Sequence, residues 1–329
     1  MERVGVIGCG AWGTTFAKLL AEKGHKVGLW CHDGEIARHI TLHRRHPFVL
    51  KDIPLPGTIS TKTLLSDLIE ESDFLVLSVA SSYISILNSI KPVYKNTPLL
   101  GLTKGVLENQ TTLFVSDYIK NTLEECPYGV LSGPNLASEI AQNYPAATVI
   151  ASKNPDVAAQ FQRLVNSPFF RVYTSSDVKG VEIGGILKNV IAIAAGIVDG
   201  LELGLNAKGA LMARGLQEMI RFGQLFSAKS ETFYGLSGLG DLIATSCSPK
   251  SRNWRVGYTL AKDGIFPDLS RQFSQDIPEG VKTAKLIRNM ALNTHLDMPI
   301  IFQVYAILYE QKTPRDAITE LFSRELRSE

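Results

Sequence analysis

A single lysine lies inside a long apolar stretch of the sequence. It is the strongest candidate for a residue that takes part in a chemical reaction. Lys188 is the only cation between Val181 and Asp199, where the helical pattern is apolar on nearly every side and predicts a buried helix. Burial disfavours the ammonium form and lowers the pKa of a lysine, which makes it a usable acid or base near neutral pH. The alternative is a structural lysine paired with a carboxylate.

Two polar segments further along could complete a site around this lysine. A glycine-dense turn that begins at Gly235 delivers one carboxylate, Asp241. A hydroxyl, a guanidinium and an amide then follow in three consecutive residues, Ser251, Arg252 and Asn253. The planar fork of an arginine suits a phosphate, either of a substrate or of a cofactor. Taken singly, Arg252 is equally compatible with an ordinary surface residue.

The N-terminal segment predicts a dinucleotide site. Gly8, Gly10 and Gly13 have G-x-G-x-x-G spacing, after a β-branched run and before a helical pattern. In such a unit the first glycine allows a tight turn, the second admits a pyrophosphate, and the third lets the helix pack on the strand. The start of the helix then offers N–H groups and a positive dipole end to the phosphates. The alternative is a glycine-rich turn without a ligand.

The second expected strand covers residues 25–30. The side chains at its end should determine whether the protein binds NAD or NADP. A carboxylate there favours the 2′-hydroxyl of NAD, whereas basic groups accept the 2′-phosphate of NADP. Asp33 favours NAD, and His32 with Arg38, Arg44 and Arg45 favours NADP, although Arg44 and Arg45 could equally belong to a solvated loop. The sequence leaves the choice open, with a slight preference for NADPH being accepted.

Three histidines follow in the same region and raise the question of a metal site. His39, His43 and His46 could share one helical face. Arg44 and Arg45 lie among them and would repel a cation, and no carboxylate accompanies them. Zinc sites usually include cysteine or a supporting acid. We therefore expect no metal, and the role of this cluster stays open.

Apolar runs alternate with helical patterns in the first half of the chain. Runs typical of buried strands cover residues 4–7, 25–30, 74–79, 98–103, 128–132, 146–151 and 169–173. The alternation predicts an α/β domain with a doubly wound, mostly parallel sheet over residues 1–180. From residue 181 only long helical patterns remain, so we expect an all-helical domain over residues 181–329.

Ligands of such sheets bind outside the carboxyl ends of the strands. Ser78, Lys104, Ser132 and Asn135 all occupy expected strand ends. Lys104 is therefore a second candidate for chemistry, the alternative being a lysine that simply reaches into solvent.

Composition excludes several classes of protein. The 329 residues carry a net charge of +2, which argues against a general nucleic-acid surface or a membrane-binding face. The expected first strand leaves no room for a secretory signal, and charges interrupt the apolar stretch 186–205, so no membrane insertion is expected. The four cysteines, Cys9, Cys31, Cys126 and Cys247, form no C-x-x-C pair and fit reduced thiols in a cytoplasmic protein.

Taken together, seven segments resemble one family. They are Gly8–Thr14, Thr103–Gly105, Ser132–Ala137, Leu187–Ala192, Gly238–Leu242, Ser251–Asn253 and Glu279–Val281. In this order and spacing they make the chain similar to bacterial-type NAD(P)-dependent glycerol-3-phosphate dehydrogenase over nearly its whole length. The resemblance implies reversible reduction of dihydroxyacetone phosphate to sn-glycerol 3-phosphate with NADPH or NADH. It also implies a Rossmann-like N-terminal domain, a helical substrate and catalytic domain, a homodimer, and a supply of glycerol phosphate for phospholipid synthesis.

The resemblance further implies roles for single positions. Lys188 matches the proton donor and acceptor, and Lys104 and Asp241 match the other catalytic residues. Substrate-binding positions are Lys104, Gly133, Asn135, Lys188, Asp241, Ser251, Arg252 and Asn253. Cofactor-contact positions are Gly8, Gly10, Ala11, Trp12, Gly13, His32, Lys104, Ala137, Arg252, Ile277 and Glu279.

The chain departs from the family's pattern at four places. Asn135 stands where serine or threonine is common, and Ala80 stands where proline is usual. Pro278 replaces a common valine, and Cys9 replaces the usual alanine or serine between the first two glycines. None of these changes removes a group that the chemistry requires.

Two other functions share parts of the pattern. A two-domain dehydrogenase of the hydroxyacid or ketopantoate type would need an anchor for a carboxylate in place of Ser251–Asn253. A catalytically silent dinucleotide sensor would keep the glycines but lose the pair Lys188 and Asp241, which this chain retains.

Overall fold

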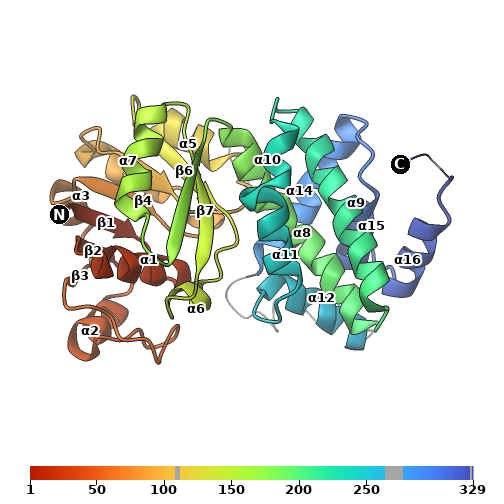
Figure 1. Ribbon diagram of the computed structural model, residues 1–329, viewed down its shortest axis with the longest axis horizontal. Coiled ribbons are helices and arrows are strands. Elements are labelled where there is room, and N and C mark those ends of the chain that lie inside the picture. The colour runs from red at the N-terminus through yellow and green to blue at the C-terminus, as the bar shows by residue number, and fades with distance from the viewer. Residues whose placement is uncertain (108–111, 264–276, 327, 329) are drawn as a thin grey trace. The chain divides into compact units, whose positions relative to one another are not determined.

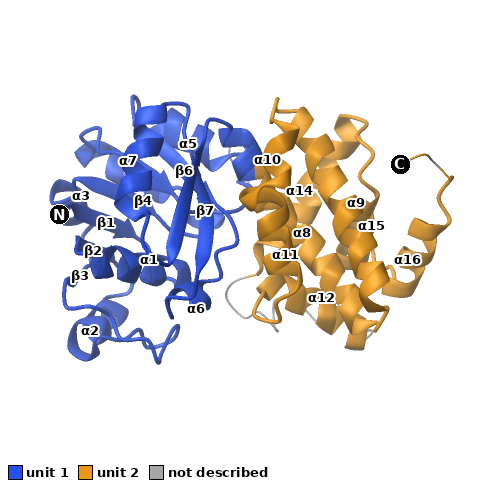
Figure 2. Cartoon of the chain, in the orientation of Figure 1, with its two compact units in different colours: residues 1–182 blue, residues 183–329 orange. Residues whose placement is uncertain are grey.

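The computed structural model describes residues 1–107, 112–263, 277–326 and 328 of the chain (Figure 1). The chain divides into two compact units, Met1–Glu182 and Ile183–Glu329 (Figure 2). Within the described residues, every strand belongs to unit 1 and unit 2 is built from helices. The expected combination of an α/β domain with a helical one is confirmed.

Unit 1 is organised around one eight-stranded sheet in the order β3-β2-β1-β4-β5-β6-β7-β8. The strands are β1 (Arg3–Ile7), β2 (Lys26–Trp30), β3 (Ile59–Lys62), β4 (Phe74–Leu77), β5 (Leu99–Gly101), β6 (Tyr128–Ser132), β7 (Ala146–Ala151) and β8 (Phe170–Ser175). Neighbouring strands are parallel except for β6 and β7, which run antiparallel. The sheet is therefore mostly parallel, as the sequence predicts.

Helices cover both faces of this sheet. They are α1 (Ala11–Glu22), α2 (Gly34–His43), α3 (Leu65–Glu70), α4 (Ile86–Ile90), α5 (Val115–Thr122), α6 (Ala137–Ile140) and α7 (Pro155–Val165), with the 3₁₀ turns η1 (Ser81–Tyr83) and η2 (Lys91–Val93). Phe16 of α1 and Phe161 of α7 pack with Val6 on one face. Leu87 of α4 and Ile119 of α5 pack on the other face. Strands β1 and β4 are buried on both sides, so their sequences are continuously apolar. The edge strand β8, by contrast, begins with alternating buried and exposed residues.

The apolar spacing between Tyr83 and Ile90 predicts one helix there, and this prediction is only partly correct. The structure has the 3₁₀ turn η1 followed by the short helix α4. The buried residues Ile84, Leu87 and Ile90 recur every three positions, which matches the period of a 3₁₀ helix better than that of a long α-helix.

Unit 2 is centred on α8 (Val178–Gly200), whose first residues still belong to unit 1. The other elements are α9 (Gly204–Gln224), α10 (Ser230–Tyr234), the π-helical turn η3 (Leu236–Gly240), α11 (Asp241–Ser246), α12 (Arg252–Asp263), α14 (Glu279–Asn293), α15 (Pro299–Tyr309) and α16 (Pro314–Phe322). Helix α8 is long and apolar enough to cross a membrane, but its apolar window is entirely buried inside the protein. It is a core helix, as its all-round apolar pattern predicts.

A close backbone contact joins α8 to the glycine-rich turn η3. A Cβ atom on Gly184 would lie 2.3 Å from the carbonyl oxygen of Ser237. Only a glycine at this point of α8 lets η3 come so near. The next turn of α8 carries Lys188, and the residue after η3 is Asp241, so the contact brings these two side chains to the same place.

Candidate active site

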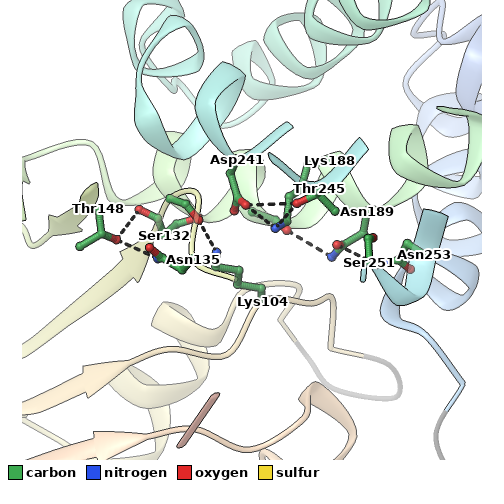
Figure 3. Close-up of polar contacts among 12 residues, drawn as sticks. Lys104, Ser132, Asn135, Thr148, Lys188, Asn189, Asp241, Thr245, Ser251 and Asn253 are labelled. Carbon is green, nitrogen blue, oxygen red and sulfur yellow. Dashed lines mark hydrogen bonds and ion pairs between the residues drawn. The ribbon is translucent and has the colours of Figure 1, made fainter. Parts of the chain in front are cut away.

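Lys188 and Asp241 form a buried ion pair in unit 2 (Figure 3). Lys188 Nζ lies 2.5 Å from Asp241 Oδ1 and donates to Thr245 Oγ1 at 2.9 Å. The Thr245 hydroxyl in turn donates to Asp241 Oδ1 at 3.3 Å. The side chains of the ion pair are 9% and 2% exposed, so water screens their attraction little. An amine, a carboxylate and a hydroxyl thus form a closed triangle in the interior of unit 2.

The partners of Lys188 come from one helix start. Asp241 is the first residue of α11, where the positive end of the helix dipole favours a carboxylate. Thr245 follows one turn later on the same face. The expected glycine-dense loop before Asp241 is instead the π-helical turn η3, an irregular element that is often found at functional sites. Sequence reasoning missed Thr245, although its i+4 spacing from Asp241 could have indicated it.

The polar segment Ser251–Asn253 forms the N-terminus of α12. Ser251 Oγ accepts the N–H of Trp254 at 3.2 Å and caps the helix. Arg252 is exposed, whereas Ser251 and Asn253 are buried. The first N–H groups of a helix have no partner within it, so the start of α12 combines an anion-attracting helix end with a guanidinium.

Asn253 ties this helix start to two other helices. Its Oδ1 accepts the N–H of Gly280 at 3.0 Å, and its Nδ2 donates to Asn189 Oδ1 at 2.9 Å. Asn189 follows Lys188 on α8, and Gly280 follows Glu279 at the start of α14. Glu279 is half-buried, as is Ile277 before it. Asn253 therefore helps to position the Lys188 region, a role that the sequence pattern did not predict.

In unit 1, the loop Gly8–Gly13 fits a dinucleotide. Gly8 has a φ of 110°, a conformation that favours glycine, and a Cβ on Gly13 would lie 2.0 Å from the Gly8 carbonyl oxygen. At Gly10, by contrast, no described atom lies within 4 Å of an added Cβ. Gly10 is the N-cap of α1, so Ala11 and the next residues present their N–H groups to this open space. The chain thus offers the turn, the room and the donors that a pyrophosphate needs.

Two more predicted cofactor residues of unit 1 lie around the start of α1. The half-buried Trp12 packs edge-on against Phe16, and its Nε1 is buried without a hydrogen-bond partner among the described residues. The carbonyl of Ala137 accepts a hydrogen bond from Thr15 Oγ1 at 3.2 Å, which holds α6 against α1. His32 lies apart from this group. It is exposed, directly beyond the end of β2.

The other predicted residues of unit 1 gather beyond β5 and β6 (Figure 3). The half-buried Lys104 donates from Nζ to the carbonyl of Gly133 at 3.0 Å. Asn135 donates from Nδ2 to Thr148 Oγ1 at 2.9 Å, and Thr148 Oγ1 donates to the carbonyl of Ser132 at 3.0 Å. The Oδ1 of Asn135 is buried without a hydrogen-bond partner within the described part of the chain. Sequence reasoning missed Thr148, because it lies on β7, which pairs with β6 only in the folded sheet.

The residues that could distinguish the ribose of NAD from that of NADP differ in the hydrogen bonds that they make within the protein. Asp33 caps α2, with Oδ1 accepting the N–H of Glu35 at 2.8 Å. Arg44 and Arg45 each donate to a backbone carbonyl nearby, at 2.8 and 3.3 Å. Arg38 is exposed on α2 and lines a hollow of about 360 Å³ together with Asp33.

The three histidines contact one another or the backbone at the C-terminal end of α2 and in the turn after it. The rings of His39 and His43 lie 4.4 Å apart, and His39 Nδ1 lies 3.0 Å from the carbonyl of Arg45. His46 is buried, and its Nδ1 accepts two backbone N–H groups of the following loop. Within the described residues, no three histidine, cysteine or acidic side chains are grouped so that they could hold a metal ion.

Comparisons with known proteins cover both units of the chain. The family described as NAD-dependent glycerol-3-phosphate dehydrogenase N-terminus matches residues 3–158, and the corresponding C-terminus matches residues 177–319. A relative from Geobacter sulfurreducens named glycerol-3-phosphate dehydrogenase (NAD(P)+) is 42% identical over 335 residues, which cover 100% of this chain and 99% of that relative.

A solved structure is similar over the same length. The crystal structure of glycerol-3-phosphate dehydrogenase from Coxiella burnetii has a TM-score of 0.92 and 34% sequence identity, and covers 98% of this chain and 99% of its own. The matched residues include the loop Gly8–Gly13, the ion pair of Lys188 with Asp241, and Arg252 at the start of α12. The chain belongs to the NAD(P)-dependent glycerol-3-phosphate dehydrogenase family.

Proposed function

We propose that this chain reduces dihydroxyacetone phosphate to sn-glycerol 3-phosphate, reversibly, with Lys188 as the proton donor and acceptor. Membership of the family supports the reaction. The observation that carries the assignment of Lys188 is its buried triangle with Asp241 and Thr245. Three groups that can exchange protons, enclosed in the interior of a unit, suit acid–base chemistry.

Reduction of a ketone adds a hydride to carbon and a proton to oxygen. When bound, NAD(P)H supplies the hydride. Lys188 Nζ gives its proton to the carbonyl oxygen, and in the reverse direction it takes the proton from the alcohol. Asp241 and Thr245 fix the direction of the amine through the hydrogen bonds described above. Correct orientation of the donor is itself a large part of the rate enhancement.

Two further groups act on the substrate in this proposal. Lys104 stabilises the negative charge that develops on the oxygen, while the carbonyl of Gly133 holds its ammonium in place. Asn135 contributes a polar contact to the substrate. Arg252, Asn253 and Ser251 bind the phosphate at the start of α12. Binding energy at the phosphate, remote from the reacting carbon, then holds the carbonyl in position.

The coenzyme contacts that we propose come from both units. In unit 1 they are Gly8, Gly10, Ala11, Trp12, Gly13, His32, Lys104 and Ala137, and in unit 2 they are Arg252, Ile277 and Glu279. We propose that NADPH is accepted, supported by the exposed Arg38 near the end of β2 and by the local capping duty of Asp33. We also propose a cytoplasmic homodimer that supplies glycerol phosphate for phospholipid synthesis.

An assay of nucleotide oxidation tests the reaction directly. Purified protein is mixed with dihydroxyacetone phosphate and either NADPH or NADH, and the consumption of each nucleotide is followed. We expect turnover, and a lower KM for NADPH than for NADH. Unphosphorylated dihydroxyacetone serves as the control and should react far more slowly, since it lacks the group that anchors the substrate. No turnover with either nucleotide would refute the proposed reaction.

The phosphate anchor has its own test in Arg252→Ala. Loss of a charge-assisted contact should raise the KM for dihydroxyacetone phosphate about 30-fold, with a smaller effect on kcat. Arg255→Ala, three residues later on α12 and equally exposed, is the matched control and should leave KM unchanged. An unaltered KM in Arg252→Ala would mean that other residues hold the phosphate.

A further inference from the structure

Two of the four cysteines meet beside the dinucleotide loop. Strands β1 and β2 are parallel neighbours with Ile7 opposite Trp30, and the N–H of Gly8 donates to the carbonyl of Trp30 at 3.2 Å. Cys31 follows directly on β2, and Cys9 follows on β1 after Gly8. Cys9 packs against the apolar cluster that contains Cys31, and the Cys31 Sγ lies 4.0 Å from the carbonyl oxygen of Leu29, to which it donates. The two thiols are close enough for each to shift the pKa of the other. The fold therefore places a dithiol at the dinucleotide loop, although the two residues lie far apart in the sequence.

The two thiols have different surroundings. Cys31 is completely buried, whereas Cys9 is half-buried in the loop between Gly8 and Gly10. Interaction with Cys31, and to a lesser extent with His46, lowers the pKa of Cys9 against the opposing effect of burial. Interaction with Cys9, together with burial, raises the pKa of Cys31. Cys9 is therefore the thiol of the pair that more readily becomes a thiolate.

His46 is close enough to Cys9 to lower the pKa of that thiol. Its side chain is buried, and Nδ1 accepts the backbone N–H groups of Phe48 and Val49 at 3.1 and 3.2 Å. A neutral imidazole that accepts at Nδ1 carries its proton at Nε2. That Nε2 is buried and has no hydrogen-bond partner among the described residues, so its N–H is available to a negative sulfur. The contribution of His46 to the low pKa of Cys9 agrees with this placement.

We propose that Cys9 and Cys31 are a peroxide-sensitive dithiol whose oxidation to a disulfide blocks dinucleotide binding. The proposal rests on the dinucleotide site of the proposed function. The Cys9 thiolate attacks one oxygen of hydrogen peroxide, the O–O bond breaks, and a sulfenic acid and hydroxide are formed. The sulfur of Cys31 then attacks the Cys9 sulfur and displaces the hydroxyl group, which leaves as water with the Cys31 proton. In sum, two thiols and one peroxide give one disulfide and two waters, and the sulfurs lose two electrons.

The structure gives a reason for oxidation to disturb the loop. Cys31 is fixed in the sheet, since its N–H donates to the carbonyl of Lys62 at 2.9 Å. Cys9 must therefore move when a disulfide forms. Its carbonyl accepts Thr14 Oγ1 at 2.9 Å, and Gly13 is packed against Gly8, so the whole loop is coupled to Cys9. A displaced loop no longer aims its N–H groups at a pyrophosphate.

The experiment uses the full chain with Cys126→Ser and Cys247→Ser as the background, which leaves only Cys9 and Cys31. The reduced protein is first assayed with dihydroxyacetone phosphate and NAD(P)H, so a failure of the proposed reaction is seen separately. It is then treated with hydrogen peroxide, quenched with catalase, and examined by peptide mass spectrometry and by titration with NADP+ and with NAD+. We expect a Cys9–Cys31 cross-linked peptide, a loss of nucleotide affinity of about tenfold or more, and recovery with dithiothreitol.

Two variants and one protection experiment complete the test. Cys31→Ser should keep its basal activity but be oxidised at Cys9 to the sulfinic acid, because no second thiol traps the sulfenic acid. Saturating NADP+ or NAD+ should slow the oxidation of the parent protein, since ligand and disulfide exclude each other. Absence of the cross-linked peptide after peroxide treatment would overturn the proposal. Unchanged nucleotide affinity of the cross-linked protein would overturn it equally.

Discussion

Helix α8 carries two lysines with buried partners. Comparing them shows whether an ion pair by itself can distinguish a catalytic lysine from a structural one. Lys179 Nζ lies 2.7 Å from Asp117, 3.1 Å from Ser116 Oγ and 3.8 Å from Glu182. It also lies 3.9 Å from the centre of the Phe114 ring. Lys179 thus binds the start of α5 to α8 within unit 1. Lys188, nine positions along the same helix, meets Asp241 and Thr245 in unit 2.

The two lysines differ in the structural elements that position their partners. The partners of Lys179 lie on the regular helices α5 and α8 and at the residue before α5. Asp241 is delivered by the π-helical turn η3, an irregular element that is retained mostly where a function needs it. An ion pair therefore does not distinguish a structural lysine from a catalytic one. A partner that is positioned by an irregular element favours a catalytic role for the lysine. Variants at the two positions test whether Lys188 acts in catalysis while Lys179 acts in stability.

The largest effect is expected for Lys188→Ala. Loss of the proton donor should lower kcat about 1,000-fold or more, while binding of NAD(P)H survives. Lys188→Arg sharpens the test, because arginine keeps the positive charge but does not release its proton, and it should be almost as inactive. Steady-state kinetics and nucleotide titration provide the measurements. A kcat near that of the parent protein in either variant would remove Lys188 from the chemistry.

Lys179→Ala should affect stability instead of turnover. Without the lysine, the buried Glu182 loses its cation, and we expect a loss of about 2 kcal/mol in the free energy of unfolding at pH 7.5. Turnover of the folded enzyme should stay within about threefold of the parent. Lys179→Arg should restore most of the stability. Denaturant titration measures the effect, and a collapse of kcat in a folded Lys179→Ala would erase the contrast with Lys188.

Glu182 makes the unit 1 cluster dependent on pH. Burial raises its pKa to about 7, although Lys179 and Ser116 oppose this rise. The folded protein therefore keeps a proton on Glu182 that the unfolded chain releases at lower pH. The resulting stabilisation is complete below about pH 4.5 and is lost as the pH rises through about 7, a change of about 3 kcal/mol.

Glu182→Gln should remove that dependence. The amide can still accept the Ser116 N–H and donate to its hydroxyl, so the contacts survive without a titrating group. Unfolding free energies between pH 5 and 8 should fall less steeply in the variant than in the parent. Equal slopes would contradict the assignment. Glu218, whose pKa burial also raises to about 7, is present in both proteins and cancels in the comparison.

Thr245→Val should give the smallest effect. It removes one hydrogen bond to Lys188 and one to Asp241 while keeping the shape of the side chain. We expect kcat to fall about tenfold and the pH dependence of kcat to shift, with little change in the KM for either substrate. Thr245→Ser keeps the hydroxyl and should recover most of the activity. A pH profile identical to that of the parent would show that Thr245 does not position the lysine.

Much of the fold follows from patterns that are local in the sequence. Strand β7 has the predicted bounds, Ala146–Ala151, because a buried parallel or mixed strand needs a short, continuous apolar run. The cap residues Asn154 and Thr313 likewise act as local chemistry predicts, each accepting the N–H that an N-cap should accept. Helix α4 was less predictable, since apolar residues at every third position fit two helix types.

Residue types and short spacings were enough to predict the class of each half of the chain, the glycine loop, and Lys188, Asp241 and Arg252 as residues worth testing. Single segments of the chain already contain these patterns. The folded structure was needed to show that Lys188 meets Asp241 across 53 positions, that Thr245 and Asn253 support them, and that Cys9 packs against the apolar cluster that contains Cys31. The physical reason is that such contacts depend on how elements pack, as where the missing Cβ of Gly184 lets η3 approach α8.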